Sequence, residues 1–198
     1  LDTWYHLACV RNGDDFTFYV DGVSKYNSSS GADDIGWEGG FYIGETASSG
    51  AYGHQPWPGW IDEFRVSRVA RYTSDFSGSL PTTAFTDDIN TVFLLHGDQS
   101  DGTAFEDKST GLAISEESRM KFDGTGDYLT VPASSDWDFG TGDFTIECWL
   151  RMSTVQYCTL YATNHTTPGG VGWFYENHDL HFYFDNGSSS ETVIDTSV

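Results

Sequence analysis

The chain has 198 residues, and 30 Asp and Glu against 9 Lys and Arg give it a formal net charge of −21. This length suits one ordinary domain, and so acidic a chain is a poor candidate for nucleic-acid binding, which needs a basic surface. The longest uninterrupted aliphatic or aromatic run, residues 92–95, is far shorter than the roughly 20 residues of a membrane-spanning helix. We therefore expect no membrane insertion and no nucleic-acid partner.

Short segments that alternate apolar and polar residues, or are rich in aromatic and β-branched residues, recur along the chain and predict strands. Asn-Gly and Asp-Gly dipeptides between them supply the positive φ of tight hairpin turns. The only candidate helical turn covers residues 67–72. The sequence therefore predicts an all-β antiparallel sandwich with strands at residues 5–11, 16–20, 41–43, 60–66, 92–95, 119–122, 128–131, 144–150, 157–161, 172–175 and 180–184.

The segment at residues 144–150 fits a strand with one buried face. Side chains alternate between the two faces of a strand, so Thr145 and Glu147 are expected opposite to the core-facing set. That set comprises Phe144, Ile146, Cys148 and Leu150. We also expect Trp4 and Trp149 to be core residues.

Four stretches resemble the laminin G-like, concanavalin A-like jelly-roll modules. They read WYHLACVRNG at residues 4–13, WIDEFRVS at 60–67, FDGTGDYLTVP at 122–132 and GDFTIECW at 142–149. The resemblance implies an antiparallel two-sheet jelly-roll sandwich. In that family the last two stretches belong to the first half of the domain and the first two to the second half. Here the closing half occupies residues 1–85 and the opening half residues 86–198.

This reversed order of the halves has three explanations. The chain is circularly permuted, which sandwiches with neighbouring termini tolerate; or it is one period of a tandem array taken out of register; or each copy completes its sheet with strands from a neighbour. All three predict the same local strands, and the last makes other copies of this chain partners. The two halves form one sandwich, within the chain or across neighbouring copies.

Acidic turns provide candidate calcium ligands. Ca²⁺ takes six to eight oxygen ligands, and glycines let turn carbonyls converge on it. The resemblance implies a structural calcium where an Asp of the closing strand meets the opening segment, which corresponds to Asp62 and to the turn with Asp123 and Asp127. The alternative is that these residues only shape turns and carry charge.

A sugar-binding surface is the second candidate. Aromatic faces beside Asp, Asn and His side chains suit stacking on sugar rings and bonding to their hydroxyls. Residues 50–59 form the most site-like loop, and the alternative is that its Pro and aromatic residues merely stiffen it. The predicted ligand-binding residues are Trp37, Tyr52, His54, Trp57 and Trp173, and Trp60 lies beside the same loops.

Catalysis has weaker support. Glycoside hydrolases of this architecture commonly carry a Glu-x-Asp-x-x-Glu strand, which the sequence lacks, and the adjacent Asp62 and Glu63 are expected on opposite faces of a strand, unable to act on one bond. We therefore expect no enzyme and assign no catalytic residues. Cys9, Cys148 and Cys158 contain no metal or redox motif and are expected to be small buried hydrophobes, although Cys148 and Cys158 could pair across a hairpin.

Together these patterns favour a non-enzymatic module, exposed outside a cell or on a virus particle, that binds a glycan or a surface protein in adhesion or host recognition. Modules with similar sequence motifs occur in phage tail and bacterial surface proteins, so the expected location outside a cell or on a virus particle follows from the resemblance. A structural repeat that builds a filament, fibre or capsid decoration is the alternative. A glycoside hydrolase is the third.

Overall fold

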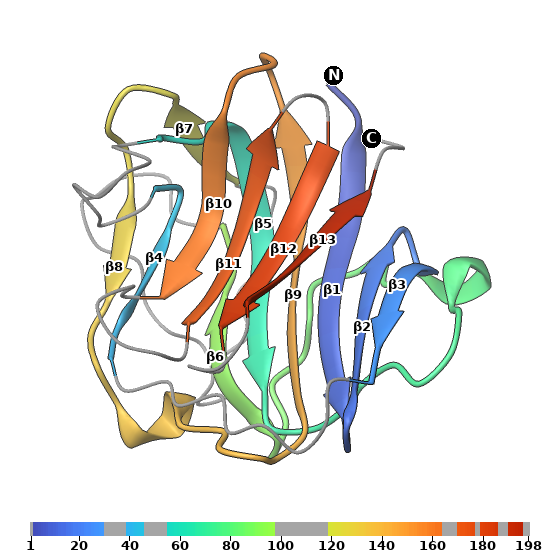
Figure 1. Cartoon of the computed structure of the whole chain (residues 1–198). Helices are drawn as coiled ribbons and strands as arrows, with labels where there is room; N and C mark the ends of the chain where they lie inside the picture. The colour runs from blue at the N-terminus through green and yellow to red at the C-terminus, as the bar shows by residue number, and fades with distance from the viewer. Residues whose placement is uncertain are drawn as a thin grey trace.

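The structure is a computed structural model and describes residues 2–29, 39–45, 55–97, 119–163, 170–176, 179–185 and 190–195. Within these ranges the chain forms thirteen strands and two short 3₁₀ turns, at Ser77–Ser79 and Ser135–Trp137. The strands make two antiparallel sheets that face each other (Figure 1). The predicted all-β sandwich is confirmed.

The larger sheet has seven strands in the order β3-β2-β1-β9-β5-β6, with β7 also paired to β5. Strand β9 comes from the second half of the sequence and pairs along its length with β1 on one side and β5 on the other. Both halves thus contribute to one sheet within one chain. The strands are β1 (Trp4–Asn12), β2 (Asp15–Val20), β3 (Val23–Ser28), β5 (Pro58–Ser67), β6 (Thr91–Leu95), β7 (Met120–Asp123) and β9 (Phe144–Met152).

The smaller sheet has six strands in the order β13-β12-β11-β10-β4-β8. The run from β10 to β13 is a meander of hairpins between consecutive strands. Its other side continues into β4 and β8, so it too combines the two halves of the sequence. The strands are β4 (Phe41–Ile43), β8 (Leu129–Val131), β10 (Cys158–Thr163), β11 (Gly170–Glu176), β12 (Asp179–Asp185) and β13 (Ser190–Asp195).

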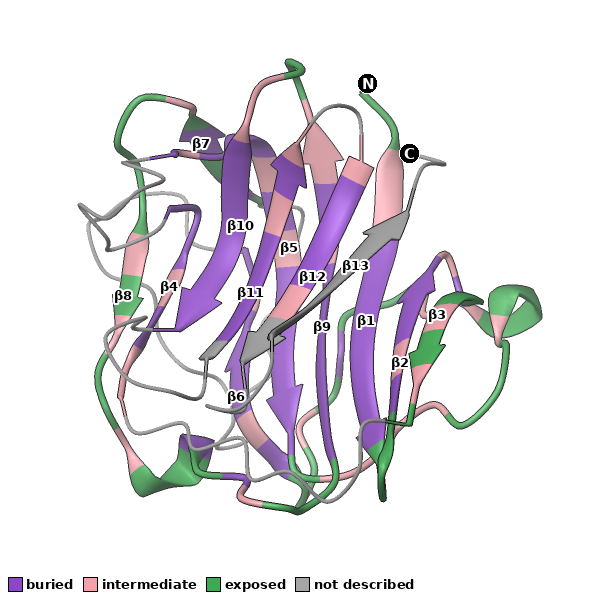
Figure 2. Ribbon diagram, viewed as in Figure 1, coloured by how far each residue is buried: buried purple, intermediate pink, exposed green. Residues whose placement is uncertain are grey.

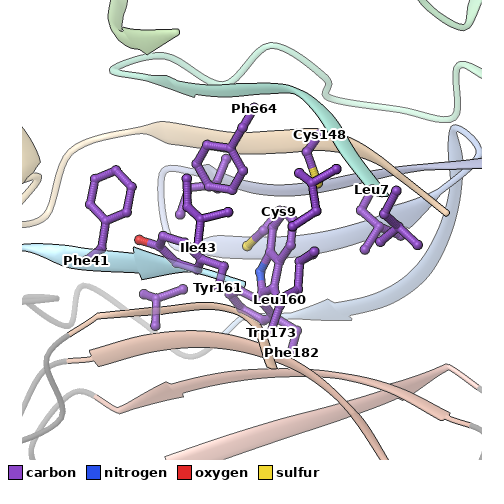
Figure 3. Close-up of a cluster of buried hydrophobic side chains, with 14 of the residues drawn as sticks. Leu7, Cys9, Phe41, Ile43, Phe64, Cys148, Leu160, Tyr161, Trp173 and Phe182 are labelled. Carbon is purple, nitrogen blue, oxygen red and sulfur yellow. The ribbon is translucent and has the colours of Figure 1, made fainter. Parts of the chain in front are cut away.

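The core fills the space between the sheets and is largely aromatic (Figure 3). Phe18 of β2 stacks on Phe182 of β12 with ring centroids 5.9 Å apart, and Phe41 of β4 stacks on Phe64 of β5 at 6.1 Å. The alternation predicted for β9 is confirmed. All four of its expected core residues are at most 2 % exposed: Phe144, Ile146, Cys148 and Leu150.

The opposite face of β9 is not open to water along its whole length. Residues 68–88, here termed the strap, cross the outer face of the seven-stranded sheet. Tyr72 and Phe76 of the strap pack on Tyr19 of β2 and on its neighbours in β1. Glu147, on the face opposite the core as expected, is consequently fully buried as well. Figure 2 shows β9 and β1 buried through most of their length.

The expected helical turn at residues 67–72 is wrong. Ser67 is still part of β5, and the strap that follows is held in an irregular path by Thr145. The Thr145 hydroxyl donates to the Val69 carbonyl over 2.7 Å and accepts from the Arg71 amide over 2.9 Å. These side-chain bonds satisfy backbone groups that a helix would otherwise pair.

Candidate functional site

A pocket of about 370 Å³ opens on the outer face of the seven-stranded sheet, where the strap leaves that face uncovered. One wall is strap residues 81–84, and the sheet supplies the floor and the opposite wall. The side chains that line it from the sheet are Trp4, Asp62, Glu63, Trp149 and Arg119, the last immediately before β7.

Cross-strand pairing brings the pocket residues together, because residues directly opposite on neighbouring strands share a face. Trp149 of β9 lies between His6 of β1 and Asp62 of β5. These strands are distant in sequence, so only the sheet makes these side chains neighbours.

A second row of side chains crosses the same strands two residues further along. It places Arg151 of β9 between Trp4 of β1 and Trp60 of β5, and Lys121 of β7 follows Trp60. Trp4, Trp60 and Arg151 are all half-buried. The row therefore alternates indole rings with cationic side chains.

A β-bulge in β5 turns both acidic residues of the pocket toward the same side. The pairing with β9 shifts register between Asp62 and Arg65, and Glu63 has a left-handed backbone with φ 53°. An extra residue in one strand breaks the alternation of faces. The expectation that Asp62 and Glu63 point to opposite faces is therefore wrong, since both line the pocket.

Both carboxylates are held by hydrogen bonds. Asp62 Oδ1 accepts from the Glu63 amide over 2.9 Å and from the Gly97 amide over 3.1 Å. Glu63 Oε2 accepts from the Phe85 amide over 2.6 Å, and its Oε1 lies 2.7 Å from His96 Nδ1. A carboxylate in this position only accepts, so His96 donates. These bonds fix the two acids and tie the end of the strap to the pocket.

Beneath the strap, Glu147 is the centre of a buried polar network. Arg65 and the Tyr72 hydroxyl donate to it over 2.6–2.8 Å, and His6 Nε2 lies 3.2 Å from Oε2. Burial by itself would raise the pKa of Glu147, but the His6 hydrogen bond and the Arg65 charge outweigh it and hold that pKa below its ordinary value. The network fastens the strap to the sheet, and so positions the pocket wall.

The predicted ligand-binding residues are distributed differently from expectation. Trp57 and Trp173 are 0 % and 1 % exposed in the core between the sheets, where Figure 3 shows Trp173 beside Phe182. Their faces are covered by protein, which corrects their assignment as stacking residues. Trp37, Tyr52 and His54 lie outside the described residues.

Two of the pocket tryptophans were expected in the core. Trp4 and Trp149 are instead half-buried at the pocket, which corrects that expectation. A signal for this was present in β9, because Trp149 stands between the core residues Cys148 and Leu150. Alternation places it on the outer face.

The predicted calcium ligands do not form one donor set. Strands β5 and β7 pair from Pro58 opposite Asp123 to Ile61 opposite Met120. Asp62 follows Ile61, so it lies at the opposite end of this pairing from Asp123. Four residues of strand separate these positions, about 13 Å. Asp123 Oδ1 accepts from the amide and hydroxyl of Thr125, and Asp127 Oδ2 from the Asp123 amide. Across the described residues, no three His, Cys, Asp or Glu side chains are grouped to hold a metal. Asp62 therefore lies apart from the turn of Asp123 and Asp127, and calcium at either place stays a prediction.

The three cysteines are buried and unpaired, as expected of small hydrophobes. Cys9 and Cys148 project into the space between the sheets (Figure 3). Burial raises the pKa of each thiol, including that of Cys158. They are consequently poor nucleophiles at neutral pH.

The two-sheet antiparallel sandwich carries an aromatic and acidic pocket on one outer face. Residues 1–75 match the laminin G family model described as the concanavalin A-like lectin/glucanases superfamily. That match covers 75 of the 198 residues and, together with the two-sheet fold, supports a laminin G-like, concanavalin A-like module, a family that in general suggests binding or lectin-like roles. No curated protein and no solved structure gave a match. In the part of the chain that the structure describes, no helix has the length and hydropathy to span a bilayer.

Proposed function

We propose that the protein is a non-enzymatic glycan-binding module, exposed outside a cell or on a virus particle, and that the outer-face pocket holds the sugar. The observation that carries the proposal is the convergence of two indole rings, Trp4 and Trp149, with two carboxylates, Asp62 and Glu63, in one pocket. Its role in adhesion or host recognition follows from that binding. The exposed setting has its support in the family resemblance.

The chemistry of the pocket suits a sugar ring. The faces of sugar rings are apolar enough to stack on indole, while their hydroxyls donate to acceptors at the edge. Trp4 and Trp149 supply the aromatic surface, and the two carboxylates supply acceptors. Because hydrogen bonds already fix Asp62 and Glu63, little ordering of these side chains is required on binding.

The same hydrogen bonds favour binding over hydrolysis. A glycosidase needs one carboxylic acid that donates a proton and a second group that acts as base or nucleophile. Both oxygens of Glu63 are engaged, by the Phe85 amide and by His96, and Asp62 receives two backbone amides. Both groups thus already serve as hydrogen-bond acceptors, which supports a binding role for them.

Glycan-array binding followed by titration calorimetry tests this function. We expect Trp149→Ala and Trp4→Ala to abolish or strongly weaken binding of any glycan that the wild type retains, since a stacked aromatic contributes much of such an interface. Tyr128→Ala is the matched control, because that ring is 51 % exposed next to β8 of the other sheet.

The proposal fails if no glycan is retained, or if both tryptophan variants bind as the wild type does while remaining folded by circular dichroism. Release of new reducing ends from the bound glycan would overturn the non-enzymatic assignment and leave the binding site in place. Substitution of Asp62 by Asn would then show whether that carboxylate takes part.

A further inference from the structure

Basic side chains gather around the tryptophans beside the pocket. Lys121 Nζ lies 5.9 Å from the Trp60 ring centroid, and Arg151 Cζ lies 4.8 Å from the same ring. Arg119 Cζ is 5.4 Å from the centroid of Trp4. The chain has only nine Lys and Arg in a total charge of −21, so three of them in one region form a local basic patch on an acidic protein.

Carboxylates lie near this patch, because Asp62 and Glu63 line the pocket with Arg119, and the Lys121 charge helps to lower the pKa of Asp123. Two of its three cations are nevertheless left without an ion pair among the described residues. Arg119 and Lys121 are exposed and form no ion pair with any described residue. Arg151 pairs with Asp2 at 3.2 Å, but the Asp2 side chain is 60 % exposed, and the Arg151 Nε is buried without a hydrogen-bond partner. A buried donor with no partner is costly, and neighbouring like charges repel. An anion bound here would relieve both.

The basic patch is continuous with the pocket. The row that contains Arg151 and Trp60 is two residues along the strands from the row that contains Trp149 and Asp62, a spacing of about 7 Å. That is close enough for one ligand to touch both rows. Arg119 lines the pocket itself and connects the two regions.

We propose that the ligand is an acidic glycan, in which a ring lies in the pocket against Trp149 and a carboxylate or sulfate group is received by Arg119, Lys121 and Arg151. This inference rests on the proposed function and names the ligand class of the same site. Guanidinium and ammonium groups bind such anions through charge-assisted hydrogen bonds, which are stronger than neutral ones. The indole faces hold the cations in place through cation–π contact.

The probes are a galacturonic acid hexamer and its fully methyl-esterified form, which has the same sugar rings without the negative charges, together with sulfated and plain dextran oligomers. We expect the acid to bind about tenfold or more tightly than the ester, and this preference to weaken as salt is raised. The variant Arg119→Gln/Lys121→Gln should lose the preference. Lys25→Gln, on β3 at the far edge of the same sheet, removes a positive charge away from the patch and should keep the preference.

The outcomes distinguish the preference for an acidic glycan from glycan binding itself. Preference for either the uronate or the sulfated oligomer supports the basic patch and identifies which anion it takes. Equal binding of the acid and the ester, or a preference that survives in the double variant, overturns the inference while the glycan site stands. Absence of binding to all four oligomers overturns this inference, and only the absence of any retained glycan on the array overturns the proposed function as well. Melting temperatures of the variants, whose changed side chains are exposed, exclude a folding defect.

Discussion

Arg65 and Glu147 form a buried ion pair on the outer face of the seven-stranded sheet. Arg65 Nε and Nη2 both donate to Glu147 Oε1, over 2.8 and 2.6 Å, and the two side chains are 9 % and 0 % exposed. The pair lies under the strap, whose Tyr72 hydroxyl binds the other oxygen of the same carboxylate. One acidic residue thus connects β9, β5 and the strap that walls the pocket.

Removal of that charge is expected to destabilise the fold. Glu147→Gln leaves Arg65 buried without a counter-charge, and loss of one member of a buried pair costs about 3–5 kcal/mol. The free energy of unfolding in urea measures this. Asp14→Asn, in an exposed turn, is the matched control and should stay within about 0.5 kcal/mol of wild type. A loss below about 1 kcal/mol in the Glu147 variant would show that the pair does not hold the strap.

Acid is expected to weaken the same region. Two hydrogen bonds from Arg71 hold the pKa of Asp88 well below its ordinary range, and the pKa of Glu147 is also lowered. A carboxyl with a depressed folded pKa contributes stability above its unfolded pKa, about 3.9 for Asp and 4.3 for Glu, and this is lost as pH falls toward the folded pKa.

The urea midpoint should therefore be level near neutral pH and fall below about pH 4. Asp88→Asn should lower the midpoint at neutral pH and flatten its decline in acid, because the variant has no proton to take up there. A decline as steep as that of wild type would contradict the role of the Arg71–Asp88 pair.

Phe18 is expected to contribute strongly to the stability of the fold, because its ring packs against the other sheet. Its ring packs on Phe182 at 5.9 Å and on Trp173 at 6.1 Å, so Phe18→Ala removes a bridge between β2 and the other sheet. We expect a loss of about 3–5 kcal/mol in the free energy of unfolding. Ile89→Ala, whose side chain is 99 % exposed, should change it by less than about 0.5 kcal/mol. Similar values for the two variants would argue against this packing.

Gly59 is expected to tolerate no side chain. A Cβ there would overlap the carbonyl oxygen of Arg151 and come within 3.0 Å of the Met152 Cα. Gly59→Ala should push β5 away from β9 and cost at least the roughly 1–3 kcal/mol of an overpacked site. At Gly78 a Cβ meets nothing within 4 Å, and Gly78→Ala should leave the melting temperature near that of wild type. Equal melting temperatures for Gly59→Ala and Gly78→Ala would contradict the close approach of β9 to Gly59.

The three thiols should be protected from alkylation in the folded protein. Cys9, Cys148 and Cys158 are buried, and burial raises the pKa of each. Iodoacetamide at neutral pH should therefore leave the native chain unlabelled and label all three cysteines in urea, as read by mass spectrometry. Rapid labelling of any one in native buffer would show that its side of the sandwich opens.

Strands with strong apolar alternation were predictable, and those without it were not. β9 alternates clearly, and the strand expected at residues 144–150 begins where β9 begins and ends two residues before β9 ends. β3 and β13 were missed because their sequences, VSKYNS and SETVID, are mostly polar. Each lies at the edge of its sheet and owes its strand conformation to pairing with one neighbour.

Local alternation also failed where the backbone departs from a regular strand. The bulge after Asp62 turns Glu63 to the same pocket, and a left-handed φ at a glutamate has no reliable sequence signal. Trp57 looked like a loop residue because glycines and prolines surround it, yet it is fully buried. Composition near an aromatic ring does not report whether the second sheet covers it.

The sequence by itself determined the all-β class, most of the strands and which side of β9 faces the core, because these depend on the alternation of neighbouring residues. Only the tertiary structure decided that β9 lies between β1 and β5, and hence that Trp4, Asp62 and Trp149 share one pocket. Pairing between distant strands sets that arrangement, and the strap decides which part of the outer face stays open. Both depend on contacts between residues far apart in the chain, which local patterns do not encode.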